Sequence, residues 1–325
     1  MSADLLEVQH LKTYFYTRTE VVKAVDDVSF TMPPSQTLGV VGESGSGKSV
    51  TALSIMRLIT SPPGKIVSGS IRFNGEDLLA KSREELSVLR GSKISMIFQD
   101  PMTSLNPLFT IGHQITETIR RHEQGISKDR AWRRAVEMLN LVGISDARRR
   151  ARSYPHEFSG GMRQRVMIAI ALACNPQLLI ADEPTTALDV TIQAQILDLM
   201  KGLSRDFGTA MMLITHDLGV VAGMCQHVNV MYAGLIVESA PVSQIFATPA
   251  HPYTVGLLQS LPRLDEGPET RLQPIHGQPP DPASLPIGCP YAPRCPKVQH
   301  RCQEERPPLM PVARGEQIAA CFYPD

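Results

Sequence analysis

The stretch at residues 40–51 reads VVGESGSGKSVT and contains the complete pattern Gly-x4-Gly-Lys-Ser at residues 42–49. Glycines at 42, 45 and 47 let the backbone turn tightly enough to aim successive N–H groups at a phosphate chain. The short apolar run Thr37–Val41, rich in β-branched residues, predicts a buried strand before the loop, and the apolar run after the pattern predicts a helix with its N-terminus towards the anion. The stretch predicts a phosphate-binding loop in an α/β fold, with a glycine-rich turn that binds nothing as the alternative. Lys48 would then reach the β- and γ-phosphates, and the Ser49 hydroxyl would bind Mg²⁺.

Composition limits the class of protein. The 325 residues allow one large domain with an appendage, or two domains, and 42% hydrophobic with 20% charged residues is ordinary for a soluble globular chain. The 32 basic and 32 acidic residues cancel, so no overall electrostatic footprint for nucleic acid is present. The longest apolar run has nine residues, and the acidic N-terminus lacks a signal-peptide core. We expect a cytosolic protein that reaches a membrane only through a partner.

The N-terminal segment, residues 5–32, alternates apolar and polar positions in two runs and predicts an antiparallel hairpin. Three adjacent aromatic residues, Tyr14, Phe15 and Tyr16, lie in its first run. One of them could stack on a nucleobase, and simple packing within the strand is the alternative.

Polar side chains follow three further apolar runs that predict buried strands. Gln99 follows residues 93–98, Asp182 and Glu183 end the strand that starts at Leu178, and His216 follows Ala210–Thr215. Ligands of α/β sheets bind at the carboxyl ends of the strands, so we expect these side chains at one edge. Two adjacent acids there fit a Mg²⁺ ligand, Asp182, and a group that polarises the attacking water, Glu183. His216 is predicted to be catalytic, with a structural histidine as the alternative.

Helical patterns occupy the middle of the chain. Residues 107–155 repeat apolar positions at helical spacing between many arginines, which predicts a helical insert. The arginines at 148, 149, 150 and 152 predict a solvated face rather than a nucleic-acid site. Ser159, Gly160 and Gly161 then precede a strongly helical run, as in an anion site at a helix N-terminus or in an ordinary helix cap.

The tail is rich in proline and cysteine. Four of the six cysteines, Cys289, Cys295, Cys302 and Cys321, fall in the last 37 residues. In a reducing cytosol such a cluster predicts a metal site rather than disulfides, and four thiolates fit zinc or an iron–sulfur cluster, with unliganded thiols as the remaining alternative. The prolines predict a tail without regular helices or strands.

Together these motifs resemble the ATP-binding subunits of ATP-binding-cassette (ABC) transporters. In that family's order the chain has the phosphate loop, a Q-loop at Gln99, the signature FSGGM at 158–162, a Walker B strand ending in Asp182 and Glu183, a D-loop at 187–189 and a switch histidine at His216. The finer texture, with IFQDPMTSLNP at 97–107 and YPHEFSGGMRQRVMIA at 154–169, is similar to the dipeptide/oligopeptide importer branch. Two positions depart from the general family pattern: Met162 replaces Gln, and Val50 replaces Thr.

The resemblance implies a P-loop NTPase fold, with a RecA-like core, an antiparallel β subdomain and a helical subdomain at about residues 105–165. An ABC ATPase domain would span residues 1–250, and an irregular Cys/Pro-rich extension would span 251–325. For the four cysteines the resemblance implies a [4Fe–4S] cluster, with Zn²⁺ as the alternative.

The resemblance also implies a set of site residues. Lys48, Gln99, Glu183 and His216 would carry catalysis, and Ser49, Gln99 and Asp182 would hold Mg²⁺. Phe15 best matches the residue that stacks on adenine. ATP would also contact the following residues, of which Ser159, Gly160 and Gly161 would act on a partner's nucleotide: Gly42, Ser44, Gly45, Ser46, Gly47, Val50, Ser159, Gly160, Gly161 and Asp189.

The implied partners are a second ABC ATPase subunit, by this branch a paralogue, two transmembrane permeases and an extracytoplasmic substrate-binding protein, without nucleic acid. The implied location is the cytoplasmic face of the inner membrane. ATP-driven closure of the ATPase pair would power the permeases. One cassette without a coiled-coil insert argues against an ABC ATPase of DNA repair or translation, and intact Lys48, Glu183 and His216 argue against a non-catalytic regulatory subunit.

Overall fold

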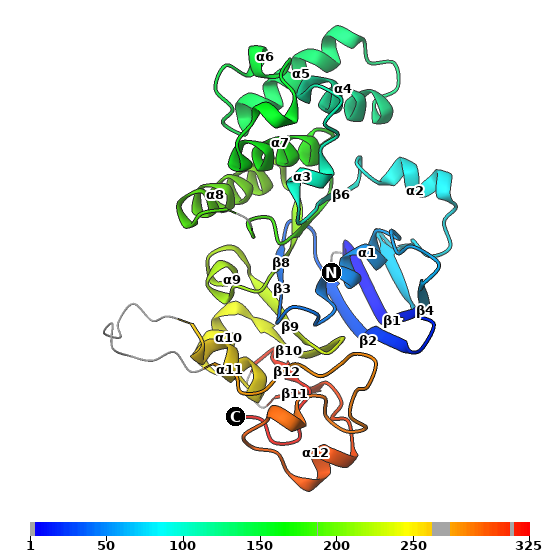
Figure 1. The fold of residues 1–325 in the computed structure, drawn as a ribbon, viewed down its shortest axis with the longest axis vertical. Helices are drawn as coiled ribbons and strands as arrows, with labels where there is room; N and C mark the ends of the chain where they lie inside the picture. The colour runs from blue at the N-terminus through cyan, green and yellow to red at the C-terminus, as the bar shows by residue number, and fades with distance from the viewer. Residues whose placement is uncertain (1–3, 187, 262–273, 313–314) are drawn as a thin grey trace. The chain divides into compact units, whose positions relative to one another are not determined.

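A computed structural model describes residues 4–186, 188–261, 274–312 and 315–325 (Figure 1). The chain forms two compact units, which are described separately. The first contains residues 1–32, 37–79 and 213–325, and the second contains residues 33–36 and 80–212. The phosphate loop and the cysteine-rich tail therefore belong to the same unit.

An antiparallel sheet begins the first unit. Its strands lie in the order β2-β1-β4-β5, and β1 pairs with β2 from Leu6 opposite Met32 to Tyr16 opposite Val21. The predicted hairpin is confirmed. The bounds of the strands are β1 Leu6–Tyr16, β2 Val21–Met32, β4 Gly64–Phe73 and β5 Glu76–Asp77.

A second sheet in the same unit positions the phosphate loop. The strand β3 (Thr37–Val41) is fully buried, pairs in parallel with β9 and leads through the loop into helix α1 (Lys48–Ile55). This is the predicted strand, loop and helix. The other elements of this part are β9 His227–Tyr232, β10 Leu235–Pro241, α9 Leu218–Met224, α10 Val242–Ala247 and α11 Pro252–Gln259.

The tail extends this second sheet. The short strand β12 (Ile318–Ala319) pairs antiparallel with β10, and β11 (Met310–Pro311) pairs with β12. The helix α12 (His300–Glu304) and the 3-10 turn η2 (Ala292–Arg294) also lie in the tail. The expectation of a tail without helices or strands is therefore too strict, because short elements fit between the prolines.

The second unit contains a parallel strand pair and the helical insert. Strand β6 (Ile94–Ile97) pairs with the fully buried β7 (Leu178–Asp182). The chain passes from the second unit to the first within β8 (Ala210–Thr215). The helical segments are α2 Arg83–Leu89, α3 Pro101–Ser104, α4 Ile111–His122, α5 Lys128–Leu141, α6 Ala147–Arg150, η1 Pro155–Glu157, α7 Gly160–Leu172 and α8 Val190–Phe207.

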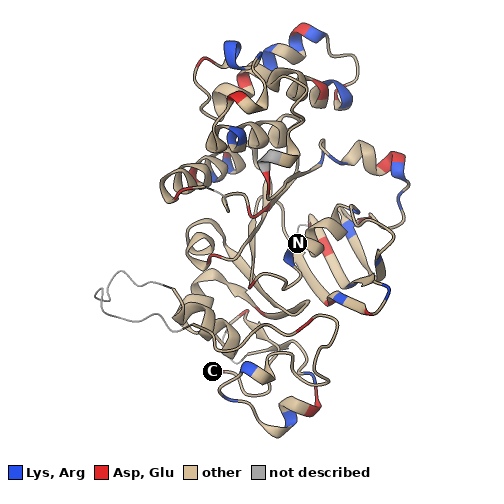
Figure 2. Cartoon of the chain, viewed as in Figure 1, with Lys and Arg blue, Asp and Glu red and all other residues tan. Residues whose placement is uncertain are grey.

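The helical insert carries apolar residues inside and charges outside. Ile111, Ile115 and Ile119 of α4 are fully buried, while acidic and basic residues are interspersed on these helices (Figure 2). Arg149 pairs with Asp146, and the Arg150 guanidinium lies 5.6 Å from the centre of the Phe158 ring. None of the described helices is long and apolar enough to span a bilayer.

Candidate nucleotide-binding site

The phosphate loop wraps around the side chain of Lys48. The Lys48 ammonium donates to the carbonyl oxygens of Gly42, at 2.7 Å, and Glu43, at 2.8 Å, and only 4% of the residue is exposed. A third contact, of 3.4 Å, joins it to the Ser46 hydroxyl. Lys48 is thus held inside the loop by the loop's own oxygens, close to the N-terminus of α1, where an anion is favoured.

Glycine is required at two positions of this loop for lack of space. A Cβ atom on Gly42 would lie 2.1 Å from the Met231 carbonyl oxygen, and one on Gly47 would lie 2.4 Å from the Ala24 carbonyl oxygen. Gly47 also has a φ of 100° and begins α1 in the left-handed region. The tight loop therefore depends on packing against the strands β2 and β9 as well as on its own sequence.

The other predicted contacts of the loop differ in exposure. Ser44 and Gly45 are exposed, whereas Ser49 and Val50 are half-buried at the start of α1. Exposed groups of this kind are accessible to a ligand.

Gln99 and Glu183 meet in the second unit, although 84 residues separate them in sequence. The Gln99 amide donates to the Glu183 carboxylate at 3.0 Å, and the Thr186 hydroxyl donates to the same oxygen at 2.8 Å. Glu183 has a φ of 47°, a left-handed conformation that a non-glycine residue adopts only when its surroundings impose it. The backbone and both donors therefore fix this carboxylate.

Asp182 ends β7 and is 5% exposed, so the first of the two acids lies at the buried end of the strand and the second on the turn after it. The D-loop begins at Ala187, which lies outside the described residues. Asp189 caps α8 by accepting the Ile192 N–H at 2.9 Å.

The signature residues begin α7. The Ser159 hydroxyl accepts the Met162 N–H at 3.4 Å, and Ser159 and Gly160 are exposed. A Cβ on Gly161 would lie 2.8 Å from the Ile192 side chain. Ser159 is thus a helix cap in this structure, and the exposed helix N-terminus retains the geometry of an anion site.

Two further predicted site residues, His216 and Phe15, belong to the first unit. His216 is exposed directly after β8. Phe15 is half-buried with its ring close to Gly64, while Tyr14 donates its hydroxyl to Asp26 at 2.5 Å and Tyr16 is 47% exposed. Burial and the Asp26 carboxylate raise the pKa of Tyr14, so this phenol stays a hydrogen-bond donor.

The four predicted cysteines gather around one small cavity of about 20 Å³. Each is a free thiol, and burial raises the pKa of Cys289 and Cys295 and raises that of Cys321 to about 11. Within the described ranges, no three His, Cys, Asp or Glu side chains are arranged to hold a metal ion. The donor set fits a thiolate-bound metal, and the predicted iron–sulfur cluster gains no direct support from this arrangement.

Sequence reasoning missed several residues that hold these groups. Glu43 fills a variable position of the phosphate-loop pattern, yet its carboxylate binds Arg294 from the tail. Thr186 fixes Glu183. No sequence signal identifies the Glu43 pair, because its two residues lie 251 positions apart.

A phosphate loop between a buried strand and a helix, and a pair of acids at the end of another buried strand, define a P-loop nucleotide-binding protein. A family model described as "ABC transporter" matches residues 25–186, and one described as "Oligopeptide/dipeptide transporter, C-terminal region" matches residues 237–302. The chain belongs to the ATP-binding proteins of the ABC transporter family, in the oligopeptide/dipeptide branch.

Relatives cover nearly the whole chain. It is 53% identical to the oligopeptide transport ATP-binding protein AppD of Bacillus subtilis, over 98% of this chain and 97% of AppD. It is also 53% identical to OppD of Salmonella typhimurium, over 98% of this chain and 94% of OppD. A solved dimeric structure of the ATP-binding cassette MJ0796 with ADP and Pi has a TM-score of 0.66 and 27% identity, covering 73% of this chain and 98% of that one. The predicted family and fold class are confirmed.

Proposed function

We propose that this chain is the ATP-hydrolysing, energy-coupling subunit of an importer for dipeptides or oligopeptides. The observation that carries the proposal is the combination, in one chain, of a complete phosphate loop and the oligopeptide/dipeptide C-terminal region. The relatives named for oligopeptide transport match along almost their full length, which supports the same class of substrate.

In this proposal Lys48 holds the β- and γ-phosphates of ATP, and Ser49, Gln99 and Asp182 hold Mg²⁺, which neutralises phosphate charge. Glu183 polarises the attacking water. The hydrogen bonds from Gln99 and Thr186 support this role, because they orient its carboxylate before substrate arrives. His216 contacts the γ-phosphate from the end of β8. Phe15 stacks on adenine, and Tyr14 and Tyr16 are the neighbouring candidates.

The partner in catalysis is a second ABC ATPase subunit, by branch a paralogue. Ser159, Gly160 and Gly161 would bind the partner's ATP, and the exposure of Ser159 and Gly160 supports this. The solved relative MJ0796 is described as dimeric. Closure of the pair on ATP and reopening after hydrolysis would drive the transport cycle.

The membrane partners are two permeases, served by an extracytoplasmic substrate-binding protein, and the chain would lie at the cytoplasmic face of the membrane. Just before α4, Leu108 is 78% exposed and Phe109 is 44% exposed. Exposed apolar side chains near the Q-loop support a contact with a permease there.

For the cysteines we retain a [4Fe–4S] cluster, with Zn²⁺ as the alternative. What supports this proposal is that Cys289, Cys295, Cys302 and Cys321 line one cavity, so the four thiols that such a metal needs as ligands lie in one place. Iron and acid-labile sulfide in anaerobically purified protein would support the cluster. Stoichiometric zinc without iron would reject it.

The function is tested with Glu183→Gln in the assembled transporter. We expect the variant to bind ATP with unchanged affinity and to lose about 10²–10⁴-fold in hydrolysis rate, as expected when a positioned base is removed. Peptide uptake into vesicles should stop with it. Undiminished hydrolysis would refute the role of Glu183, and normal ATPase activity with no stimulation by any peptide-loaded binding protein would refute the substrate class.

A further inference from the structure

An ion pair between Arg294 of the tail and Glu43 of the phosphate loop joins these two segments. Arg294 donates two hydrogen bonds to the Glu43 carboxylate, of 2.6 Å and 3.0 Å, one to each oxygen. The Arg294 side chain is 4% exposed and that of Glu43 is 27% exposed. A two-pronged guanidinium–carboxylate pair with this little exposure fixes orientation as well as distance. The hydrogen bond to Glu43 is the main cause that raises the pKa of Arg294, so its charge is permanent.

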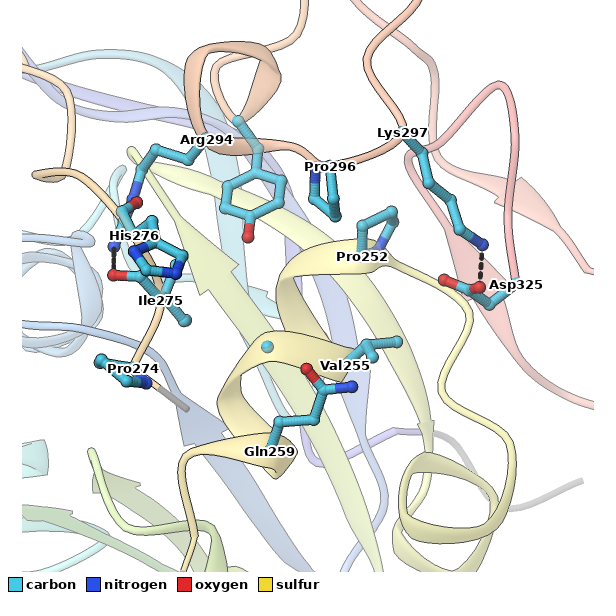
Figure 3. A pocket seen from close by; sticks show the side chains of 12 residues that line it. Pro252, Val255, Gln259, Pro274, Ile275, His276, Arg294, Pro296, Lys297 and Asp325 are labelled. Carbon is cyan, nitrogen blue, oxygen red and sulfur yellow. Dashed lines mark hydrogen bonds and ion pairs between the residues drawn. The ribbon is translucent and has the colours of Figure 1, made fainter. Parts of the chain in front are cut away.

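Arg294 is itself held by further hydrogen bonds, within the tail and to the end of β9. Its Nε donates to the His276 carbonyl at 3.0 Å, and one terminal nitrogen reaches the Tyr232 hydroxyl at 3.3 Å. Figure 3 shows Arg294 beside His276 and Ile275 at one end of a cavity of about 760 Å³. These contacts fix the position of the Arg294 guanidinium, unlike that of an arginine on the exposed surface.

The backbone of Glu43 links this ion pair to Lys48. The Glu43 N–H donates to the Tyr253 hydroxyl at 2.9 Å, and the Glu43 carbonyl accepts Lys48 at 2.8 Å. The Ser46 N–H also donates to that carbonyl, at 3.2 Å. Displacement of Glu43 would thus move an oxygen that positions Lys48 and a turn that shapes the loop.

We propose that Arg294 is a positioning residue for nucleotide binding, and that through Glu43 the tail sets how well this cassette's phosphate loop is preorganised for ATP. This inference rests on the proposed function, since it takes the loop to bind ATP. A preorganised site binds more tightly because less ordering is needed when the ligand arrives. The tail is then part of the nucleotide site, in addition to any metal that it holds.

The test measures ATP affinity of the full-length chain by titration with a fluorescent ATP analogue and Mg²⁺. For Arg294→Gln we expect Kd to rise about tenfold, or about 1.4 kcal/mol. Arg294→Lys keeps the charge but not the fork, so we expect partial rescue, with Kd raised about threefold. ATPase KM should rise in parallel, while kcat at saturating ATP stays within about twofold, because the groups around the attacking water are unchanged.

Two further variants separate positioning from folding. Glu43→Gln removes the negative charge and one of the two acceptor oxygens from the loop side of the pair, and leaves Arg294 its contacts with Tyr232 and His276. We therefore expect Kd to rise in this variant too. The double variant should be no worse than either single one, because both remove one interaction. Lys297→Gln is the matched control, since Lys297 pairs with Asp325 beside the same cavity, on the side away from Arg294 (Figure 3).

Wild-type Kd in both Arg294→Gln and Glu43→Gln, together with lost binding in Lys48→Ala, would overturn the positioning role and leave the nucleotide site standing. Equal loss of affinity in Lys297→Gln would also overturn it, because any damage to the tail would then suffice. Unimpaired binding in Lys48→Ala would remove the nucleotide site and the positioning role together.

Discussion

Glu238 is a fully buried carboxylate that fastens the tail to the sheet, and its removal gives a sharp test of the packing described above. One oxygen accepts the Ala250 N–H at 2.8 Å and the Gln317 amide at 2.6 Å, and the other accepts the His251 N–H at 2.8 Å. Glu238 is 0% exposed, so water cannot replace it without rearrangement. Glu238→Ala would leave these three buried donors without their acceptor.

The loss of stability in Glu238→Ala can be worked out from the number of buried donors that are left unpaired. The Gln317 amide also donates to the Thr248 carbonyl at 2.9 Å, so it retains one bond, while the Ala250 and His251 N–H groups lose theirs. Each buried donor left unpaired costs about 1–3 kcal/mol, which gives about 4 kcal/mol for two. Glu238→Gln keeps one acceptor oxygen and should cost about 2 kcal/mol. Gln317→Ala, the matched control, removes both hydrogen bonds of the Gln317 amide and leaves the two backbone donors satisfied by Glu238.

Amide hydrogen exchange measures this locally. In the wild type the amides of Ala250 and His251 should be protected, and in Glu238→Ala their protection should fall about a thousandfold, as about 4 kcal/mol implies. Urea unfolding followed by circular dichroism gives the accompanying change in midpoint. Protection equal to that of Gln317→Ala, or an unchanged midpoint, would refute the reasoning that Glu238 anchors this segment.

Three other predictions concern the first unit. Gly47→Ala should abolish ATP binding, because the new Cβ atom would lie 2.4 Å from the Ala24 carbonyl oxygen. Gly45→Ala has open space for its Cβ, so it should lower the free energy of unfolding, measured by thermal unfolding, by only about 1 kcal/mol, the strain of a φ of 78°. Equal effects of the two substitutions on ATP binding and unfolding would contradict this. Burial raises the pKa of Cys225 to about 12, so at about pH 8 roughly one thiol in 10⁴ is ionised. Iodoacetamide should therefore modify Cys225 only after the protein unfolds, which mass spectrometry would show. Labelling of the folded protein at the rate of a free thiol would disprove this prediction. Burial raises the pKa of Asp26, but hydrogen bonds from Tyr14 and Arg306 outweigh it and lower the pKa below its usual value. As the pH falls, the unfolded chain therefore binds the proton first, so the stability contributed by Asp26 is present above about pH 4 and is lost in acid. The free energy of unfolding in urea should be higher for the wild type than for Asp26→Asn at neutral pH, and this difference should shrink towards about pH 3. A difference that stays constant with pH would exclude this linkage.

Much of the fold could be read from local patterns. The buried strands Thr37–Val41 and Ala210–Thr215 were predicted at their observed bounds, because a strand buried on both faces is a short apolar run between polar breaks. The helix after Ser159 was predicted because a capping residue precedes a long apolar run. The short strand at Ile318–Ala319 was not predicted, since its pairing with β10 is decided by a distant edge rather than by its own residues.

The candidate site divides in the same way. Lys48, Asp182 and Glu183 were predicted because motif chemistry is local to the end of a strand. The bonds that orient them were not, since Gln99 reaches Glu183 across 84 residues and Arg294 reaches Glu43 across 251. No pattern of composition or spacing encodes such a meeting.

The sequence by itself determined that this chain has a phosphate loop, an ABC signature and a cysteine-rich tail, because each depends on residues that are neighbours in the chain. The tertiary structure decided that the tail joins the sheet of the phosphate-loop unit and that its arginine holds the loop's glutamate. The physical reason is that hydrogen bonds and ion pairs act over a few ångströms in space, so the partner of Glu43 is chosen by the folded path of the backbone.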